Sequence, residues 1–166
     1  MVEAWFDGCC EPVNPGGYAA WGALVKVDGS VVYADGGYCG TGRKMSNNVA
    51  EYAGAEAALL EAEKHSGKVI LRGDSKLVIM QLSKRWGVRG GLYVPFYEKA
   101  VLVASRLKPR LRMEWIPRRF NGECDKLSKG VLKEMNIKFR IQPEEDDIPE
   151  EVNELDVQYQ QALFKD

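Results

Sequence analysis

The chain has 166 residues, of which 45% are hydrophobic and 28% charged, and this composition predicts one soluble, globular domain with a sizeable core. Its apolar runs are too short to cross a bilayer, and the N-terminus has no basic start or long apolar stretch, so we expect a cytoplasmic protein without membrane contact or signal peptide. The net charge divides into +7 over residues 1–142 and −8 over residues 143–166, which favours either a polyanionic partner such as nucleic acid or a solvated surface with a neutralising tail.

The first forty residues predict three strands joined by turns. Residues 2–7 are apolar-rich and short, and a turn-rich stretch follows at residues 9–17. Residues 18–27 and 31–38 have the composition of strands, and Asp28-Gly29 between them is a strong hairpin signal. We therefore expect a three-stranded antiparallel meander.

Helices and strands alternate in the rest of the body. Apolar residues recur at helical spacing over residues 48–65, and Gly67 is a suitable stop for that helix. We expect strands at residues 68–73 and 110–116, and helices that end near residues 86, 107 and 135. The order β-β-β-α-β-α-α-β-α predicts an α/β domain with a mixed sheet.

The composition changes after residue 142. Residues 143–149 resemble a solvated linker, and four apolar residues then recur at helical spacing, at Val152, Leu155, Tyr159 and Leu163. We therefore divide the chain into a domain at residues 1–142 and an acidic linker with a short amphipathic tail at residues 143–166.

Four acids lie at element ends that a mixed sheet could bring together. Asp7 and Asp74 end the first and fourth predicted strands, and Glu51 and Asp125 lie in the first turns of two helices. Each also has a simpler interpretation, as a turn residue for Asp7 and as a helix cap or helix-end charge for the other three. Four converging carboxylates would repel one another unless cations neutralised them, and oxygen ligands favour Mg²⁺ or Mn²⁺.

Five segments resemble the signature blocks of type 1 ribonuclease H, in the family's order and on matching elements. They are residues 5–8 (Trp-Phe-Asp-Gly), 14–18 (Asn-Pro-Gly-Gly-Tyr), 46–52 (Ser-Asn-Asn-Val-Ala-Glu-Tyr), 73–75 (Gly-Asp-Ser) and 121–127 (Asn-Gly-Glu-Cys-Asp-Lys-Leu). The resemblance covers residues 2 to about 135. It implies a ribonuclease H-like fold, with a mixed five-stranded sheet of three antiparallel strands and then two parallel strands, flanked by helices.

The resemblance also implies an activity and a set of site residues. The family hydrolyses the RNA strand of RNA–DNA hybrids with two Mg²⁺ ions, for which Mn²⁺ could substitute, and leaves 5′-phosphate and 3′-hydroxyl ends. The implied catalytic and metal-binding residues are Asp7, Glu51, Asp74 and Asp125. Contacts with the hybrid minor groove are implied for Asn14, Asn47 and Asn48, and contacts with a DNA-strand phosphate for Lys44 and Ser46. Turn and helix-cap roles remain open for the asparagines.

The chain departs from the family pattern in the loop before the last helix, which lacks the family's mobile histidine. Its only histidine, His65, lies at the far end of a helix, and we assign it no catalytic role. Arg118 or Arg119 would either replace the missing histidine or simply contact a phosphate. Lys76 stands where family members often carry an amide, and lysine can still contact a phosphate.

The segment after Asp74 also lacks the basic, tryptophan-containing handle of well-known family members. Trp86 with Arg85 and Arg89 is either a reduced substitute for that handle or, for the tryptophan, a core residue. Without a full handle, we expect this protein to bind a hybrid more weakly, and with more sensitivity to salt, than a handle-bearing enzyme does.

Two alternative functions remain open on the same fold, and we expect a monomer in each case. One is a resolvase-like nuclease, against which the Asn47-Asn48 block argues. The other is a hybrid-binding module whose chemistry has lapsed, against which the presence of all four acids argues. The fold alone does not decide between them.

Residues 160–164 (Gln-Gln-Ala-Leu-Phe) resemble the short peptide by which bacterial DNA-replication proteins dock on the sliding clamp. Leu163 and Phe164 would be apolar anchors, and Gln160 would form a hydrogen bond at the pocket rim. Alternatively the tail packs on the protein's own body, or its acidic residues fold over the basic body and compete with nucleic acid.

Overall fold

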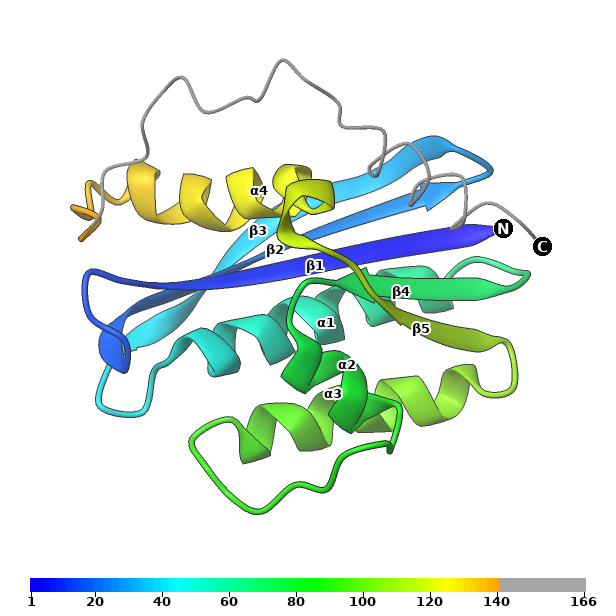
Figure 1. The fold of residues 1–166 in the computed structure, drawn as a ribbon. Coiled ribbons are helices and arrows are strands. Elements are labelled where there is room, and N and C mark those ends of the chain that lie inside the picture. The colour runs from blue at the N-terminus through cyan, green and yellow to red at the C-terminus, as the bar shows by residue number, and fades with distance from the viewer. Residues whose placement is uncertain (141–166) are drawn as a thin grey trace.

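The computed structural model of the protein describes residues 1–140 (Figure 1). The predicted linker, the amphipathic tail and the clamp-like peptide of residues 160–164 lie outside the described residues. Within residues 1–140, no helix is long and apolar enough to cross a membrane.

One five-stranded sheet forms the centre of the fold, with the strand order β3-β2-β1-β4-β5. The antiparallel part consists of β1 (Val2–Glu11), β2 (Gly16–Val27) and β3 (Ser30–Gly42). Both β4 (Val69–Gly73) and β5 (Leu111–Trp115) run parallel to β1. The predicted mixed sheet of three antiparallel strands and two parallel strands is therefore confirmed.

Helices cover both faces of the sheet (Figure 1). One face carries α1 (Asn47–Glu63), with α2 (Lys76–Leu82) and α3 (Val94–Leu107) beside it. The other face carries α4 (Gly122–Glu134), which follows a short 3-10 helix, η1 (Arg118–Phe120). The predicted order of elements is confirmed, with η1 as an addition.

The main core lies between the sheet and α1 and α3. Its largest side chains are fully buried, among them Phe6, Tyr52, Leu59, Leu71 and Leu107. Burial of each such side chain contributes about 1.5–3 kcal/mol to the free energy of unfolding. A smaller cluster of Cys9, Ala20, Leu132 and Phe139 lies under α4. Because the central strand is covered on both faces, β1 is buried along almost its whole length.

Two glycines bring the helices close to the sheet. A Cβ atom at Gly8 in β1 would lie 2.3 Å from the backbone nitrogen of Glu51 in α1. A Cβ atom at Gly22 in β2 would lie 2.4 Å from the carbonyl oxygen of Cys124 in α4. Any side chain at either position would therefore push a helix away from the sheet, and the acids on these helices would move with it.

Three predicted element ends are wrong. The third strand ends at Gly42 rather than at residue 38. The first strand does not end at residue 7 but continues to Glu11, because its second half pairs with β2. The helix after Asp74 ends at Leu82 rather than near residue 86. Lys84 has a left-handed backbone conformation, with φ of 62°, which is incompatible with a continuing α-helix.

Candidate active site

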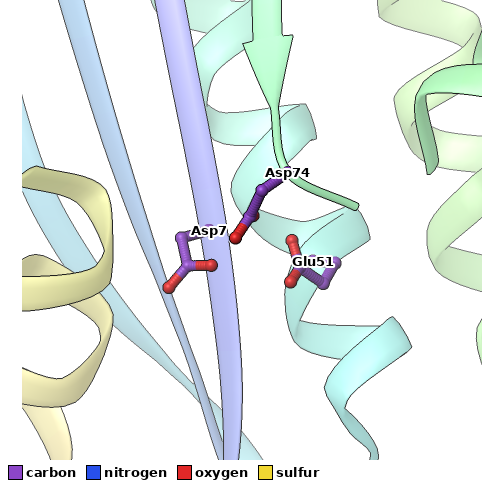
Figure 2. Close-up of side chains that lie close together, drawn as sticks. All are labelled: Asp7, Glu51 and Asp74. Atoms are coloured by element: carbon purple, nitrogen blue, oxygen red, sulfur yellow. The ribbon is translucent and has the colours of Figure 1, made fainter. Parts of the chain in front are cut away.

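Three of the four predicted acids converge in the middle of the sheet, where the end of β4 lies beside the middle of β1. The pairing of Phe6 with Gly73 brings the following residues, Asp7 and Asp74, to the same place. Glu51 approaches from the first half of α1 (Figure 2). Each of the three side chains offers a carboxylate oxygen, and these oxygens lie within 4.8 Å of one another. Asp7 and Glu51 are only 5% and 9% exposed.

The simpler interpretations of Glu51 and Asp74 do not hold. The N-cap of α1 is Ser46, whose hydroxyl accepts a hydrogen bond from the backbone N–H of Val49 at 3.2 Å. The N-cap of α2 is Ser75 rather than Asp74. Because serines cap both helices, the carboxylates of Glu51 and Asp74 are left for the cluster.

The cluster is electrostatically unfavourable without a counter-charge. Burial raises the pKa of Asp7 to about 7, and the negative charge of Asp74 adds to the effect. Burial, followed by the charges of Asp7 and Asp74, raises the pKa of Glu51 well above its usual value. The buried Oε2 atom of Glu51 has no hydrogen-bond partner among the described residues. A buried group of carboxylates with an unpartnered oxygen suits a divalent cation such as Mg²⁺.

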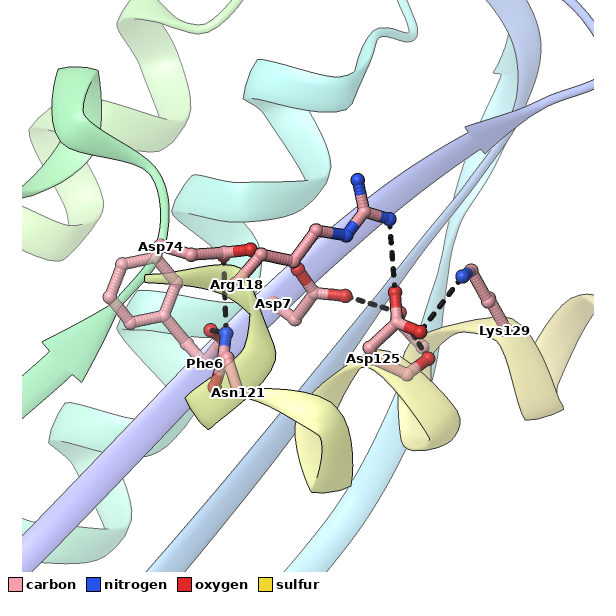
Figure 3. A network of polar contacts seen from close by, with 8 residues as sticks. Phe6, Asp7, Asp74, Arg118, Asn121, Asp125 and Lys129 are labelled. Carbon is pink, nitrogen blue, oxygen red and sulfur yellow. Dashed lines mark hydrogen bonds and ion pairs between the residues drawn. The ribbon is translucent and has the colours of Figure 1, made fainter. Parts of the chain in front are cut away.

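The fourth acid, Asp125, lies near this cluster but outside the group of three. Each of its two carboxylate oxygens faces a base (Figure 3). Lys129 Nζ is 2.8 Å from Oδ2, and Arg118 Nη2 is 3.3 Å from Oδ1. The charge of Asp125 still acts on Asp7, whose pKa it raises.

Two polar residues that sequence reasoning missed contact the acids directly. Asn121 Nδ2 donates hydrogen bonds to the backbone oxygen of Phe6 at 2.7 Å and to Asp74 Oδ1 at 3.2 Å (Figure 3). Ser128 Oγ donates to Asp7 Oδ2 at 2.8 Å. Ser128 lies three residues after Asp125, on the same face of α4; that spacing was the one sequence signal that could have revealed it.

The residues expected to contact the hybrid gather mainly where the loop after β1 meets the start of α1. Asn14 Oδ1 accepts a hydrogen bond from the backbone N–H of Asn47 at 2.9 Å. Asn48 follows on α1, Lys44 lies in the turn before it, and both Asn47 and Lys44 are exposed. The residues for which minor-groove and phosphate contacts are predicted at this end of α1 therefore lie close together.

The basic residues of the predicted site are exposed, and the histidine lies elsewhere. Lys76 is the first residue of α2 and is exposed. Arg118 and Arg119 lie in η1, where the guanidinium of Arg119 is 5.0 Å from the ring centroid of Phe120. His65 lies beyond the end of α1, about 20 Å along the helix from Glu51 at 1.5 Å per residue, in agreement with its exclusion from the site.

The segment between α2 and α3 is exposed. The side chain of Trp86 is 43% exposed, so its interpretation as a core residue is wrong. Arg85 and Arg89 on the same segment are also exposed. An aromatic side chain with two nearby bases therefore faces solvent between α2 and α3.

The strand order, the helices on both faces and the carboxylate cluster at the meeting point of β1 and β4 define a ribonuclease H-like protein. The model of the family described as "Reverse transcriptase-like" matches residues 6–131. The chain belongs to this family, and the resemblance to type 1 ribonuclease H is confirmed.

Three relatives illustrate the similarity. A bifunctional protein of Mycobacterium tuberculosis is 38% identical over 121 residues, which are 72% of this chain but only 32% of that protein. The structure of RNase H1 from Halobacterium salinarum has 30% identity and a TM-score of 0.66, and the match covers 80% of this chain and 98% of that one. The structure of LC11-RNase H1 in complex with an RNA/DNA hybrid has a TM-score of 0.72 over 82% of this chain and 99% of that one. At 22% identity, this last likeness concerns the fold.

Proposed function

We propose that the protein is a ribonuclease H, an endonuclease that hydrolyses the RNA strand of RNA–DNA hybrids and leaves 5′-phosphate and 3′-hydroxyl ends. The observation that carries the proposal is the cluster of Asp7, Glu51 and Asp74, whose carboxylate oxygens lie within 4.8 Å of one another. The similarity to RNase H1 from Halobacterium salinarum, at 30% identity over 98% of that chain, supports the proposal.

Two divalent cations, Mg²⁺ or in its place Mn²⁺, would be held by Asp7, Glu51, Asp74 and Asp125. When bound, such a pair activates the attacking water and stabilises the leaving oxygen of a phosphodiester. The protein's part is to hold the carboxylates together beside the end of β4, where Asp7 and Glu51 are buried. All four acids come from one chain, and we therefore propose that a monomer is sufficient.

Substrate recognition would rest on the surface at the start of α1. Asn14, Asn47 and Asn48 would contact 2′-hydroxyls and base edges in the minor groove, which distinguish RNA from DNA. Lys44 and Ser46 would bind a phosphate of the DNA strand, and Lys76 a further phosphate. These contacts would set the position of the hybrid across the carboxylate cluster.

Arg118 would perform the role of the loop histidine that this chain lacks. Its guanidinium already lies beside the acidic cluster, 3.3 Å from Asp125. Because η1 is short and exposed, the guanidinium of Arg118 would leave Asp125 when the substrate binds. It would then stabilise negative charge on the scissile or departing phosphate. Arg119 would contact a phosphate of the hybrid at the border of the site.

The test is a cleavage assay on matched substrates, with the full chain and Mg²⁺. We expect cleavage of the RNA strand of a hybrid, and little or none of double-stranded RNA, single-stranded RNA or double-stranded DNA. Asp74→Asn, which changes one ligand atom and little volume, should nearly abolish cleavage while hybrid binding largely survives.

Three results would contradict the proposal. Equal cleavage of double-stranded DNA would favour a resolvase-like nuclease. Hybrid binding without cleavage by the parent would favour a binding module. Cleavage by Asp74→Asn within a few-fold of the parent would contradict the metal assignment.

A further inference from the structure

Ser128 on α4 is a fully buried polar residue that has no part in the proposed chemistry. Its relative exposure is 0%. The hydroxyl oxygen lies 2.8 Å from Asp7 Oδ2 and 3.0 Å from the backbone oxygen of Asp125, one turn earlier on the helix. A serine hydroxyl has a single hydrogen to donate, and an ionised carboxylate is the stronger acceptor of the two. The hydrogen bond to Asp7 is therefore the favoured one.

The packing of α4 explains why a serine reaches Asp7. Asp7 pairs with Gly22 across β1 and β2. A Cβ atom at Gly22 would lie 2.4 Å from the carbonyl oxygen of Cys124 and 2.8 Å from the backbone nitrogen of Ser128. The backbone of α4 thus touches β2, and only a short side chain fits between the helix and Asp7. An alanine would fill nearly the same space, so packing alone does not require the hydroxyl.

We propose that Ser128 is a positioning residue that fixes the orientation of the Asp7 carboxylate for cation binding; this inference rests on the proposed function. The terminal torsion of an aspartate is soft and has broad minima. A donor held on Oδ2 by a buried helix restricts that torsion and leaves the other oxygen, Oδ1, free of this contact. The carboxylate is then preorganised, and less conformational freedom is lost when a cation binds.

The same hydroxyl joins the two parts of the site. Its hydrogen bond to Asp7 ties β1 to α4, the helix that carries Asp125 one turn before Ser128. Asp125 stands outside the group of three acids, turned toward Lys129 and Arg118. Ser128 therefore also sets the separation between that group and the turn of helix that carries the fourth acid.

The experiment compares Mg²⁺ binding by the full-length parent, Ser128→Ala and Ser128→Cys. The control is Ser105→Ala on α3. It removes a hydroxyl whose hydrogen bond within residues 1–140 goes to the backbone oxygen of Val101 at 2.7 Å. Binding is measured by calorimetric titration and by the Mg²⁺-dependent rise in melting temperature, both without substrate. Cleavage rates over Mg²⁺ and hybrid concentrations give the KM for the hybrid separately.

We expect Ser128→Ala to bind Mg²⁺ about ten- to a hundredfold more weakly, the usual effect of removing a group that hydrogen-bonds a metal ligand. The Mg²⁺ concentration for half-maximal cleavage should rise in parallel, while the KM for the hybrid at saturating Mg²⁺ stays unchanged. Ser128→Cys, with a weaker donor of similar size, should fall between parent and Ser128→Ala. Ser105→Ala should match the parent.

An unchanged Mg²⁺ affinity in Ser128→Ala would overturn the inference. So would a loss of melting temperature without Mg²⁺ that is not accompanied by weaker Mg²⁺ binding, because that result would assign Ser128 to packing alone. A parent that binds Mg²⁺ but does not cleave hybrid would refute the proposed function instead. The substrate-free titrations would still decide the role of Ser128.

Discussion

The side chains of Asp7 and Glu51 combine burial with like charge. A carboxylate loses hydration when it is buried, and a second carboxylate within about 5 Å raises its pKa further. Asn121 and Ser128 each donate one hydrogen bond to the acids, which offsets part of this penalty. Without a cation, Asp7 and Glu51 therefore hold protons at higher pH than exposed acids do.

This protonation predicts a pH-dependent stability for the cation-free protein. The pKa of Asp7 rises from 3.8 to about 7, so the folded state binds the proton more tightly than the unfolded state. The contribution of Asp7 protonation to the free energy of unfolding is fully present below about pH 4, and it is lost as the pH rises through about 7. In the presence of a chelator, the melting temperature of the parent should fall more between pH 5 and pH 8 than that of Asp7→Asn.

Mg²⁺ should stabilise the protein more as the pH rises, because a cation binds only the ionised carboxylates. The rise in melting temperature caused by Mg²⁺ should therefore grow from pH 5 to pH 8 in the parent. Equal pH dependence in the parent and Asp7→Asn, both measured with the chelator, would contradict the assignment of this behaviour to Asp7.

At the scale of elements, periodicity and turn residues predicted the types and order of helices and strands. They did not predict the length of β1, because residues 8–11 extend the strand only through pairing with β2. The motifs located the four acids in the sequence. The contacts of Asn121 with Phe6 and of Ser128 with Asp7 join residues 115 and 121 positions apart. No local pattern indicates the first contact, and only the three-residue spacing from Asp125 points to the second.

The contact between α4 and β2 leads to a prediction at this scale. Gly22→Ala would place a Cβ atom 2.4 Å from the carbonyl oxygen of Cys124, so α4 would have to move. We expect the free energy of unfolding to fall by about 1–3 kcal/mol, as in other overpacked cores. Cleavage should fall as well, because Ser128 and Asp125 move with the helix. Thermal denaturation and the cleavage assay measure the two effects.

Gly130→Ala on the same helix is the matched control. A Cβ atom at Gly130 meets nothing within 4 Å, and an alanine inside a helix is more favourable than glycine by about 0.5–1 kcal/mol. This variant should be at least as stable as the parent and equally active. If Gly22→Ala is as stable and as active as Gly130→Ala, the site does not depend on the close approach of α4 to β2.

At the scale of the whole molecule, charge is divided between the body and the segment of residues 143–166. The body carries +7 and this segment −8. Exposed bases of the body lie around the site, among them Lys44, Lys76 and Arg118. A polyanion such as a hybrid and an acidic peptide of the same chain are both suitable partners for such a surface, and salt weakens the binding of either.

Deletion of residues 143–166 separates these roles. All four acids and the basic body remain in the shortened chain, so hybrid cleavage should persist. If the acidic segment competes with nucleic acid, the shortened chain should bind the hybrid more tightly than the parent at low salt, and the difference should shrink as salt is added. Equal affinities at every salt concentration would exclude this competition.

The clamp-like peptide gives the last prediction. In residues 160–164, Leu163 and Phe164 would fill an apolar pocket of a bacterial sliding clamp, and Gln160 would bond at its rim. In a calorimetric titration with such a clamp, the parent should bind, and Leu163→Ala/Phe164→Ala should abolish binding without change in hybrid cleavage. Because the double substitution leaves the charge of the segment intact, it distinguishes apolar docking from electrostatic attraction. No detectable binding by the parent, or equal binding by the variant, would remove the clamp as a partner.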